Sequence, residues 1–226
     1  VRRARRRIVR ELETAGALAP GGAAGEASVA PGILQGLAPP PSLLRRLDVQ
    51  RFPVVLRALE HPSLFHVAAA LLGVDEVETT VYKWLRAVPP GEFTGPHMDR
   101  AYVGGGRKLT AWIPLGEISA GSAGCGVLCW VPGSHEDPAM VERFREYQRA
   151  GADGERSGWL APDPSALHLP RGCCWRTTDF ALGDVAFFGM DLLHTTVPNG
   201  TTTFRISCDT RWRPVGEGSS EVDVGP

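Results

Sequence analysis

Between residues 76 and 212 the chain consists of short segments rich in β-branched and aromatic residues, with Gly and Pro between them. These segments lie at residues 77–86, 108–115, 126–131, 184–188, 194–197 and 203–212. Several short strands separated by turn residues are typical of a sandwich or barrel, whereas βαβ units would place helices between the strands. We therefore predict a mainly β core at residues 76–212.

The first 75 residues have a helical pattern instead. Apolar residues at helical spacing predict a helix over residues 2–15, and the Gly-, Ala- and Pro-rich residues 17–40 predict a surface loop. Two further helices are predicted at residues 49–60 and 63–72, the second ending at Gly73. A chain of 226 residues can fold around one substantial core. We expect a single domain, residues 1–226, in which residues 1–75 support the β core.

An insertion interrupts the strand pattern at residues 135–180. Asp137-Pro138 predicts the start of a helix that runs to about residue 150. The irregular stretch that follows carries Trp159, His168, Arg171, Trp175 and Arg176. Long irregular segments inside compact domains are usually functional or disordered, and the many large side chains favour a lid over a site.

Charge and cysteine content limit the partners and the compartment. The net charge of −1 gives no electrostatic reason to expect nucleic acid or a membrane surface as a partner. No apolar run approaches the roughly 20 residues of a membrane-spanning helix, and the basic N-terminus lacks the apolar stretch of a secretory signal. Five cysteines, one pair of them adjacent, do not suggest a disulfide framework, so we expect the cytoplasm or another reducing compartment. The chain does not begin with Met, so a preceding targeting segment stays open, as does the oligomeric state.

The motif Gly95-Pro96-His97-Met98-Asp99 contains a candidate pair of metal ligands. In a β-strand, residues two apart point to the same face, so His97 and Asp99 should converge. His194 opens a strand segment far along the chain and offers a third ligand. Two His and one carboxylate leave coordination positions open, as in non-haem Fe(II) oxygenases. Such a triplet with a remote His also arises by chance, so the triad alone is a weak signal.

Arg205 strengthens this interpretation, because an apolar strand is a poor place for an Arg that meets no anion. Its guanidinium offers a bidentate fork to a carboxylate, which a dicarboxylate cosubstrate supplies. Thr196, two residues after His194, is expected to share its face and to donate a hydroxyl to the same carboxylate. The alternative for Arg205 is a structural ion pair.

Longer motifs resemble the phytanoyl-CoA dioxygenase (PhyH) family. They are His97-Met98-Asp99, LTAWIPL at residues 109–115, VPGSH at 131–135 and GDVAFF at 183–188, followed by His194, Asn199 and Arg205. They occur in the family's order and cover about residues 80–212, whereas the N-terminal helices match only in general character.

The resemblance implies a double-stranded β-helix, also called a jelly roll or cupin-like fold, and an oxygenase that uses Fe(II), 2-oxoglutarate and O₂. It implies that His97, Asp99 and His194 bind iron and that Arg205 binds the distal carboxylate of 2-oxoglutarate, with Thr196 where the family often has Ser or Thr. The expected reaction is hydroxylation of a C–H bond in a small organic substrate, with release of succinate and CO₂. Because Asp99 occupies the position that related halogenases leave to a small residue, hydroxylation is favoured over halogenation.

Two further positions are implied as cosubstrate contacts. Trp112 lies on a strand that commonly lines the cosubstrate pocket in the family, although a core Trp is an equal alternative. Relatives place a polar contact on the strand before the iron motif, and we expect Lys83 there. Alternation along a strand puts Trp84 and Arg86 on the face opposite to Lys83. Either Lys83 or the other two residues can therefore contact the cosubstrate, but not both.

Substrate contacts are expected from residues near the predicted mouth and in the lid, and their charges would suit an anionic or polar substrate. The candidates are Arg100, Tyr102, Trp159, Arg171, Trp175 and Arg176. His135 follows a Pro-Gly turn and is expected to brace a loop rather than bind iron.

Two other classes stay open from the sequence. A cupin-type enzyme with another metal usually brings an HxH motif, which is absent here. A catalytically silent jelly-roll module that binds small molecules or protein would not need the three ligands and the Arg.

Overall fold

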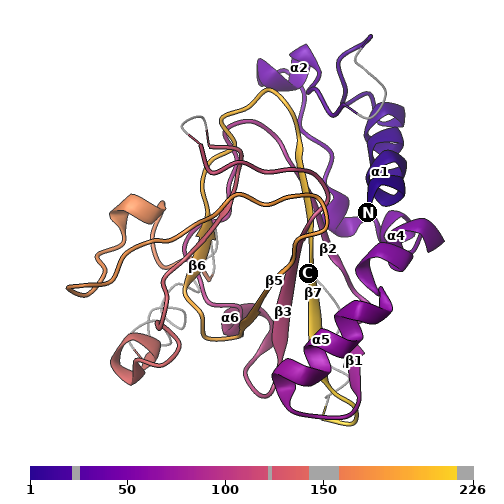
Figure 1. Cartoon of the computed structure of the whole chain (residues 1–226). Helices are drawn as coiled ribbons and strands as arrows, with labels where there is room; N and C mark the ends of the chain where they lie inside the picture. Colours follow the sequence, from indigo (N-terminus) through magenta and orange to yellow (C-terminus); the bar gives the residue numbers. More distant parts are fainter. Residues whose placement is uncertain (22–25, 122–123, 143–157, 218–226) are drawn as a thin grey trace.

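The computed structural model describes residues 1–21, 26–121, 124–142 and 158–217. Two antiparallel sheets form its centre, and helices cover one face of the larger sheet (Figure 1). Among the described residues, no helix has the length and apolar character that a membrane crossing requires. The mainly β class predicted from the sequence is confirmed.

The larger sheet is organised around its C-terminal strand, β7 (Arg205–Pro214). β7 pairs with β1 (Val77–Thr79), β2 (Trp84–Val88) and β3 (Leu109–Pro114), and β3 pairs with β5 (Ala186–Gly189). The smaller sheet pairs β4 (Leu128–Trp130) with β6 (His194–Thr196). Isolated bridges from His97 to His194 and from Trp130 to Arg176 extend this pairing.

The two faces of β7 have opposite character because successive strand residues point to opposite sides. Ile206, Cys208 and Trp212 are buried in the main core against the helices. Arg205 and Asp209 point the other way and line a pocket between the sheets. One strand therefore serves both the core and the pocket.

The helical layer consists of α1 (Arg2–Thr14), α4 (Pro53–Leu59) and α5 (Pro62–Leu72), which lie together beside the larger sheet in Figure 1. Shorter pieces join them: α2 (Pro31–Leu34), η1 (Leu43–Arg45) and α3 (Leu47–Gln50). Ile8 and Leu12 of α1 and Leu59 of α4 are fully buried in the core that includes Trp212. Two short elements lie elsewhere, α6 (Arg100–Val103) and η2 (Pro164–Ala166).

Two predicted elements are divided in the structure. The predicted helix at 49–60 is broken into α3 and α4, because Phe52 precedes a proline and adopts an extended backbone with ψ of 130°. The predicted strand at 77–86 is broken into β1 and β2. Thr79 pairs with Trp212 and Trp84 with Asp209, so the chain between β1 and β2 carries two more residues than the facing part of β7 and loops out.

The insertion is described only in part. Residues 138–142 are helical as predicted, and most of the predicted helix lies outside the described residues. Residues 158–180 contact the β core, with the Leu160 N–H donating to the Pro96 carbonyl over 2.7 Å.

Candidate metal centre

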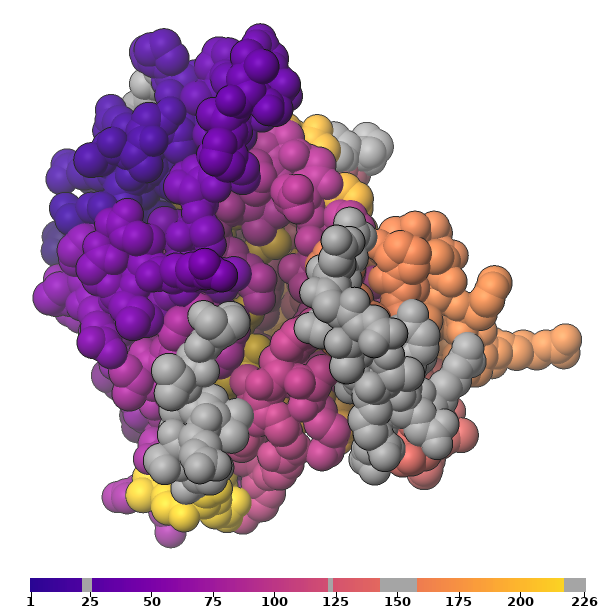
Figure 2. All heavy atoms as spheres, turned by 180° about the vertical axis from the view of Figure 1, so that it is seen from behind, coloured from indigo at the N-terminus to yellow at the C-terminus, as the bar shows by residue number. Residues whose placement is uncertain are grey.

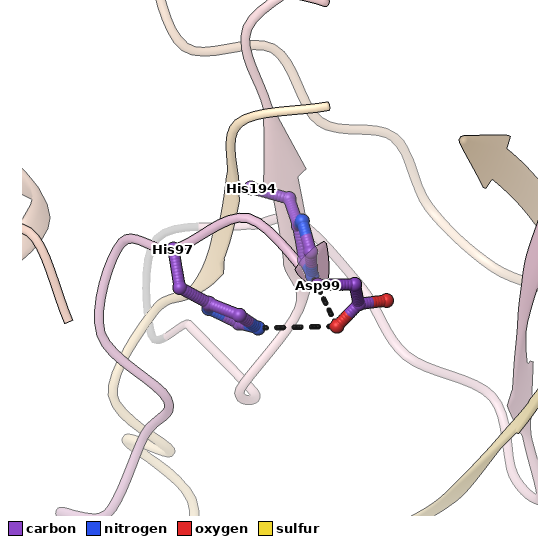
Figure 3. A group of neighbouring side chains, drawn as sticks. All are labelled: His97, Asp99 and His194. Atoms are coloured by element: carbon purple, nitrogen blue, oxygen red, sulfur yellow. Dashed lines mark ion pairs between the residues drawn. The ribbon is translucent and has the colours of Figure 1, made fainter. Parts of the chain in front are cut away.

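His97, Asp99 and His194 converge at the edge of the smaller sheet (Figure 3). One ligand atom from each lies within 4.8 Å of the others, and all three side chains are buried. The Nε2 atoms of His97 and His194 are 3.6 and 3.8 Å from Oδ1 of Asp99. Among the described residues this is the one group of three or more His, Cys, Asp or Glu with such spacing.

The backbone that brings the ligands together differs from the predicted strand. His97 and His194 exchange two backbone hydrogen bonds, of 2.9 and 3.0 Å, so the two imidazoles start from neighbouring positions. Asp99 instead has a helical backbone, with φ of −61°, and is the N-cap of α6. The carboxylate turns toward the imidazoles because the chain bends into α6, and the expectation that alternation along a strand aligns the pair was wrong.

Both imidazoles are held with Nε2 toward the centre. Nδ1 of His97 is 2.8 Å from the Gly95 carbonyl oxygen, and Nδ1 of His194 is 2.8 Å from that of Leu192. A carbonyl only accepts, so Nδ1 carries the proton and Nε2 presents a lone pair, the arrangement typical of metal-binding histidines. Burial, with a smaller contribution from the neighbouring His97, lowers the pKa of His194 to about 4, so the His194 ring is neutral at neutral pH.

Asp99 is 2% exposed, and its carboxylate is held by two residues that were not predicted from the sequence. Nη2 of Arg211 donates to Oδ1 over 3.2 Å, and the Thr110 hydroxyl donates to Oδ2. Burial by itself would raise the pKa of Asp99, but the charge of Arg211 and contacts with His97 and His194 hold it well below its usual range. Arg205, Arg211 and Arg213 share a face of β7, so the even spacing of Arg along this strand was the available signal.

Arg205 lies in the pocket beside the triad without a complete set of partners. Its side chain donates to the Ser207 hydroxyl, and its carbon Cζ lies 5.8 Å from the Trp112 ring centroid. Nε and Nη2 are buried and have no hydrogen-bond partner in the described structure. Burial, then repulsion from Arg86, lowers the pKa of Arg205 to about 10. A guanidinium that is buried and unsatisfied in this way is suited to bind an anion.

The other predicted cosubstrate contacts have different outcomes. Thr196 and Trp112 line the same pocket as Arg205. Lys83 does not line it: its ammonium is fully buried 2.9 Å from Glu60 of the helical layer. Arg86 lines the pocket instead and pairs with Asp209 over 3.2 Å. The expectation for Lys83 was wrong, because the loop between β1 and β2 turns this side chain toward the helices.

Two of the predicted substrate contacts lie near the triad. The Tyr102 ring centroid is 5.4 Å from that of His97, and Trp159 packs against Phe93 at 5.5 Å. Trp159 also covers Gly95, where an added Cβ would lie 2.4 Å from the indole.

The remaining predicted contacts are placed differently. Arg100 is paired with Asp191, which links the segments that carry Asp99 and His194. Trp175 packs against two apolar clusters, one around Trp112 and Phe188 and one around Met98 and Leu160, while Arg171 and Arg176 are exposed. None of these four residues lines the pocket beside the triad. His135 is 45% exposed, lies near Glu136 and does not line the pocket beside the triad.

Comparisons with known proteins find a matching family and solved structures of similar fold. The family model described as phytanoyl-CoA dioxygenase (PhyH) matches residues 44–207. Among solved structures, the epimerase SnoN in complex with Fe³⁺, alpha ketoglutarate and nogalamycin RO has a TM-score of 0.54 and 18% identity, over 96% of this chain and 82% of that one. AviO1 from Streptomyces viridochromogenes Tue57 has a TM-score of 0.51 and 22% identity, over 80% of this chain and 67% of that one.

Other matches cover less of the relative. The carbocyclase SnoK from nogalamycin biosynthesis has a TM-score of 0.51 and 17% identity, over 73% of this chain and 60% of that one. In another SnoN structure the match covers 64% of the relative. No curated protein matches the sequence. Since the family model covers most of the chain, including all three candidate ligands and Arg205, the chain belongs to the phytanoyl-CoA dioxygenase (PhyH) family.

Proposed function

We propose that this protein is an Fe(II)- and 2-oxoglutarate-dependent oxygenase that hydroxylates a C–H bond of a small organic substrate. The observation that carries the proposal is the buried guanidinium of Arg205, with two unpartnered nitrogens, in the same pocket as His97, Asp99 and His194. On this proposal the two sheets are the two halves of a double-stranded β-helix with the pocket between them.

The donor set fits Fe(II). His97 and His194 offer neutral Nε2 atoms whose direction is fixed by carbonyls, and Asp99 offers an ionised carboxylate. Two His and one carboxylate with open positions form the ligand set of non-haem Fe(II) oxygenases. Arg211 and Thr110 keep the carboxylate in one orientation.

The cosubstrate would be held by residues of both sheets. Arg205 would bind its distal carboxylate through the nitrogens that lack partners. The Thr196 oxygen already accepts from the Thr94 N–H over 2.8 Å, so its hydroxyl proton is available for the same carboxylate. Trp112, Leu128 and Phe188 form an apolar wall that keeps water away from the site.

When bound, iron and 2-oxoglutarate supply oxidative decarboxylation by O₂, which yields succinate and CO₂ and leaves one oxygen atom for the substrate C–H bond. The protein's own residues orient the reactants and exclude water. The Tyr102 ring packs against His97, and the Trp159 ring covers Gly95. We propose that these two rings cover the reacting centre.

The test is anaerobic addition of Fe(II) and then 2-oxoglutarate, followed by visible spectroscopy for the weak charge-transfer band of the chelate. We expect the band in the wild type, its loss in His97→Ala, and its retention in the matched control His135→Ala, which removes an exposed imidazole. Succinate formation under O₂ supplies the activity readout. Absence of the band in the wild type would refute the proposal.

A further inference from the structure

A second cavity adjoins the pocket that is lined by His97, Asp99, His194 and Arg205, which we call the metal pocket. It has a volume of about 230 Å³ and lies between residues 40–44, strand β2 and residues 92–94. Figure 2 shows the surface hollowed between the violet N-terminal part and the magenta middle of the chain, the two parts that supply the lining residues. Most of its lining is apolar, with Pro40, Pro41, Leu43, Val88, Pro89 and Phe93 among the contributors.

Two residues connect this cavity to the proposed reaction centre. Arg86 and Thr94 line both the cavity and the metal pocket. Thr94 is three residues before His97 and is fixed to β6, because its N–H donates to the Thr196 hydroxyl and its carbonyl accepts from the Thr196 N–H. A molecule that fills the cavity would therefore reach the metal pocket past Arg86 and Thr94.

Hydrogen bonds fix the wall formed by residues 40–44. The Gln50 amide donates to the carbonyls of Leu43 and Leu44 over 3.3 and 3.0 Å, and the Tyr82 hydroxyl also donates to Leu44. Gln50 and Tyr82 are both buried. Buried side chains therefore hold residues 43 and 44 of this wall in a defined position.

The opposite wall is fixed by Asn199. Its amide donates to the Val88 carbonyl over 2.9 Å, its backbone N–H donates to the Glu92 carbonyl over 3.0 Å, and its carbonyl accepts from Gly91 over 2.8 Å. Asn199 is fully buried. The cavity therefore has two preformed walls, as small-molecule sites usually do.

The charges of the lining residues and the volume of the cavity indicate which kind of chemical group it can bind. Nε of the Arg86 guanidinium is paired with Oδ2 of Asp209 over 3.2 Å, so the positive charge of Arg86 faces a carboxylate of the protein itself. The other charged lining residue is Glu92, an exposed acid that would repel phosphate or carboxylate groups. An engineered apolar cavity of about 150 Å³ binds benzene, so about 230 Å³ suits a group somewhat larger than one ring.

We propose that this cavity binds an uncharged, apolar limb of the substrate, a ring system or branched alkyl group, while the carbon to be oxidised extends past Thr94 to the metal. The inference rests on the proposed oxygenase function. It replaces the expectation of an anionic or polar substrate, because Arg100 is paired with Asp191, and Arg100, Arg171 and Arg176 all lie outside both pockets.

The experiment uses the full chain loaded anaerobically with Fe(II) and 2-oxoglutarate, and 1-aminonaphthalene as a neutral two-ring probe with environment-sensitive fluorescence. Ser42→Trp adds an indole at an exposed lining residue that makes no side-chain capping bond. Ala38→Trp is the matched control, exposed on the same segment and outside the lining. We expect probe binding to weaken at least tenfold in Ser42→Trp and less than twofold in Ala38→Trp.

A second variant and a second probe complete the test. Glu92→Trp fills the cavity from the opposite segment and takes the place of Ser42→Trp if that protein loses the charge-transfer band. The charged analogue 2-naphthyl phosphate is expected to bind at least tenfold more weakly than the neutral probe. No probe binding to the loaded wild type, equal binding to the Trp variants, or stronger binding of the phosphate would overturn the inference. A wild type without the band would instead overturn the proposed function.

Discussion

Replacing Arg205 with Met should change stability and cosubstrate binding in opposite directions. The side chain is 5% exposed and has two buried nitrogens without partners, so the protein without cosubstrate retains an unsatisfied charge. An unsatisfied buried polar group costs about 1–3 kcal/mol, and Met fills a similar volume without that cost. The variant loses the bond to Ser207, about 1 kcal/mol, and the contact with Trp112, about 0.5 kcal/mol.

The balance predicts that the free energy of unfolding of the cosubstrate-free protein rises by about 0.5 kcal/mol, or about 1–2 °C in Tm. The affinity for 2-oxoglutarate should fall sharply, because truncating one partner of a buried charge pair costs about 2–5 kcal/mol. That is a rise in Kd of at least about 30-fold. Thermal unfolding without 2-oxoglutarate and titration of the charge-transfer band with it measure the two quantities.

Arg86→Met is the matched control for the stability effect. Arg86 is paired with Asp209, whose side chain is 11% exposed, so the removal of Arg86 leaves a nearly buried acid without this partner. We expect this variant to lose about 1 kcal/mol of stability, or about 2–4 °C. An Arg205→Met protein that is destabilised as much as Arg86→Met, or that binds 2-oxoglutarate as the wild type does, would refute the reasoning.

Three further predictions concern the residues around the site. Thr110→Val removes the hydroxyl that orients Asp99, and metal affinity measured by competition with a chelating dye should fall about 10- to 100-fold; unchanged affinity would contradict this role. Lys83→Met should leave the Kd for 2-oxoglutarate within twofold, since Lys83 faces Glu60. Burial lowers the pKa of Lys83 below 10.5, so the unfolded state binds more protons between the folded pKa and 10.5. The free energy of unfolding of the wild type, compared with that of Lys83→Met, should therefore rise as the pH increases from the folded pKa of Lys83 toward 10.5. Urea unfolding at several pH values measures this difference. Fe(II) at about 100 times its Kd should stabilise the wild type by about 2.7 kcal/mol in anaerobic thermal unfolding, and a similar gain in His97→Ala would count against the ligand set.

Much of the fold was predictable because local patterns determine it. Short strands with Gly and Pro between them indicated a mainly β core, and helical periodicity located α1 and α5. The motifs around His97 and His194 indicated the family, which the family model confirms. The roles proposed for these ligands and for Arg205 remain predictions, although the structure brings the residues into one pocket.

Tertiary structure decided which side chains reach that pocket. Alternation along one strand did not reveal that residues 80–83 loop out against β7, which sends Lys83 to the helices and leaves Arg86 at the site. Arg211 of β7 can donate its hydrogen bond to Asp99 only because the tertiary structure places β7, which pairs with β3, near the turn that leads into α6.

The sequence by itself therefore determined the class of fold, the family and the set of chemical groups. Only the tertiary structure decided their neighbours and the cavity between residues 40–44 and 92–94. The physical reason is that the face a residue presents follows from the short period of its own strand or helix. The groups that it meets there come from pairing between segments distant in the sequence, where a loop of two extra residues redirects a side chain.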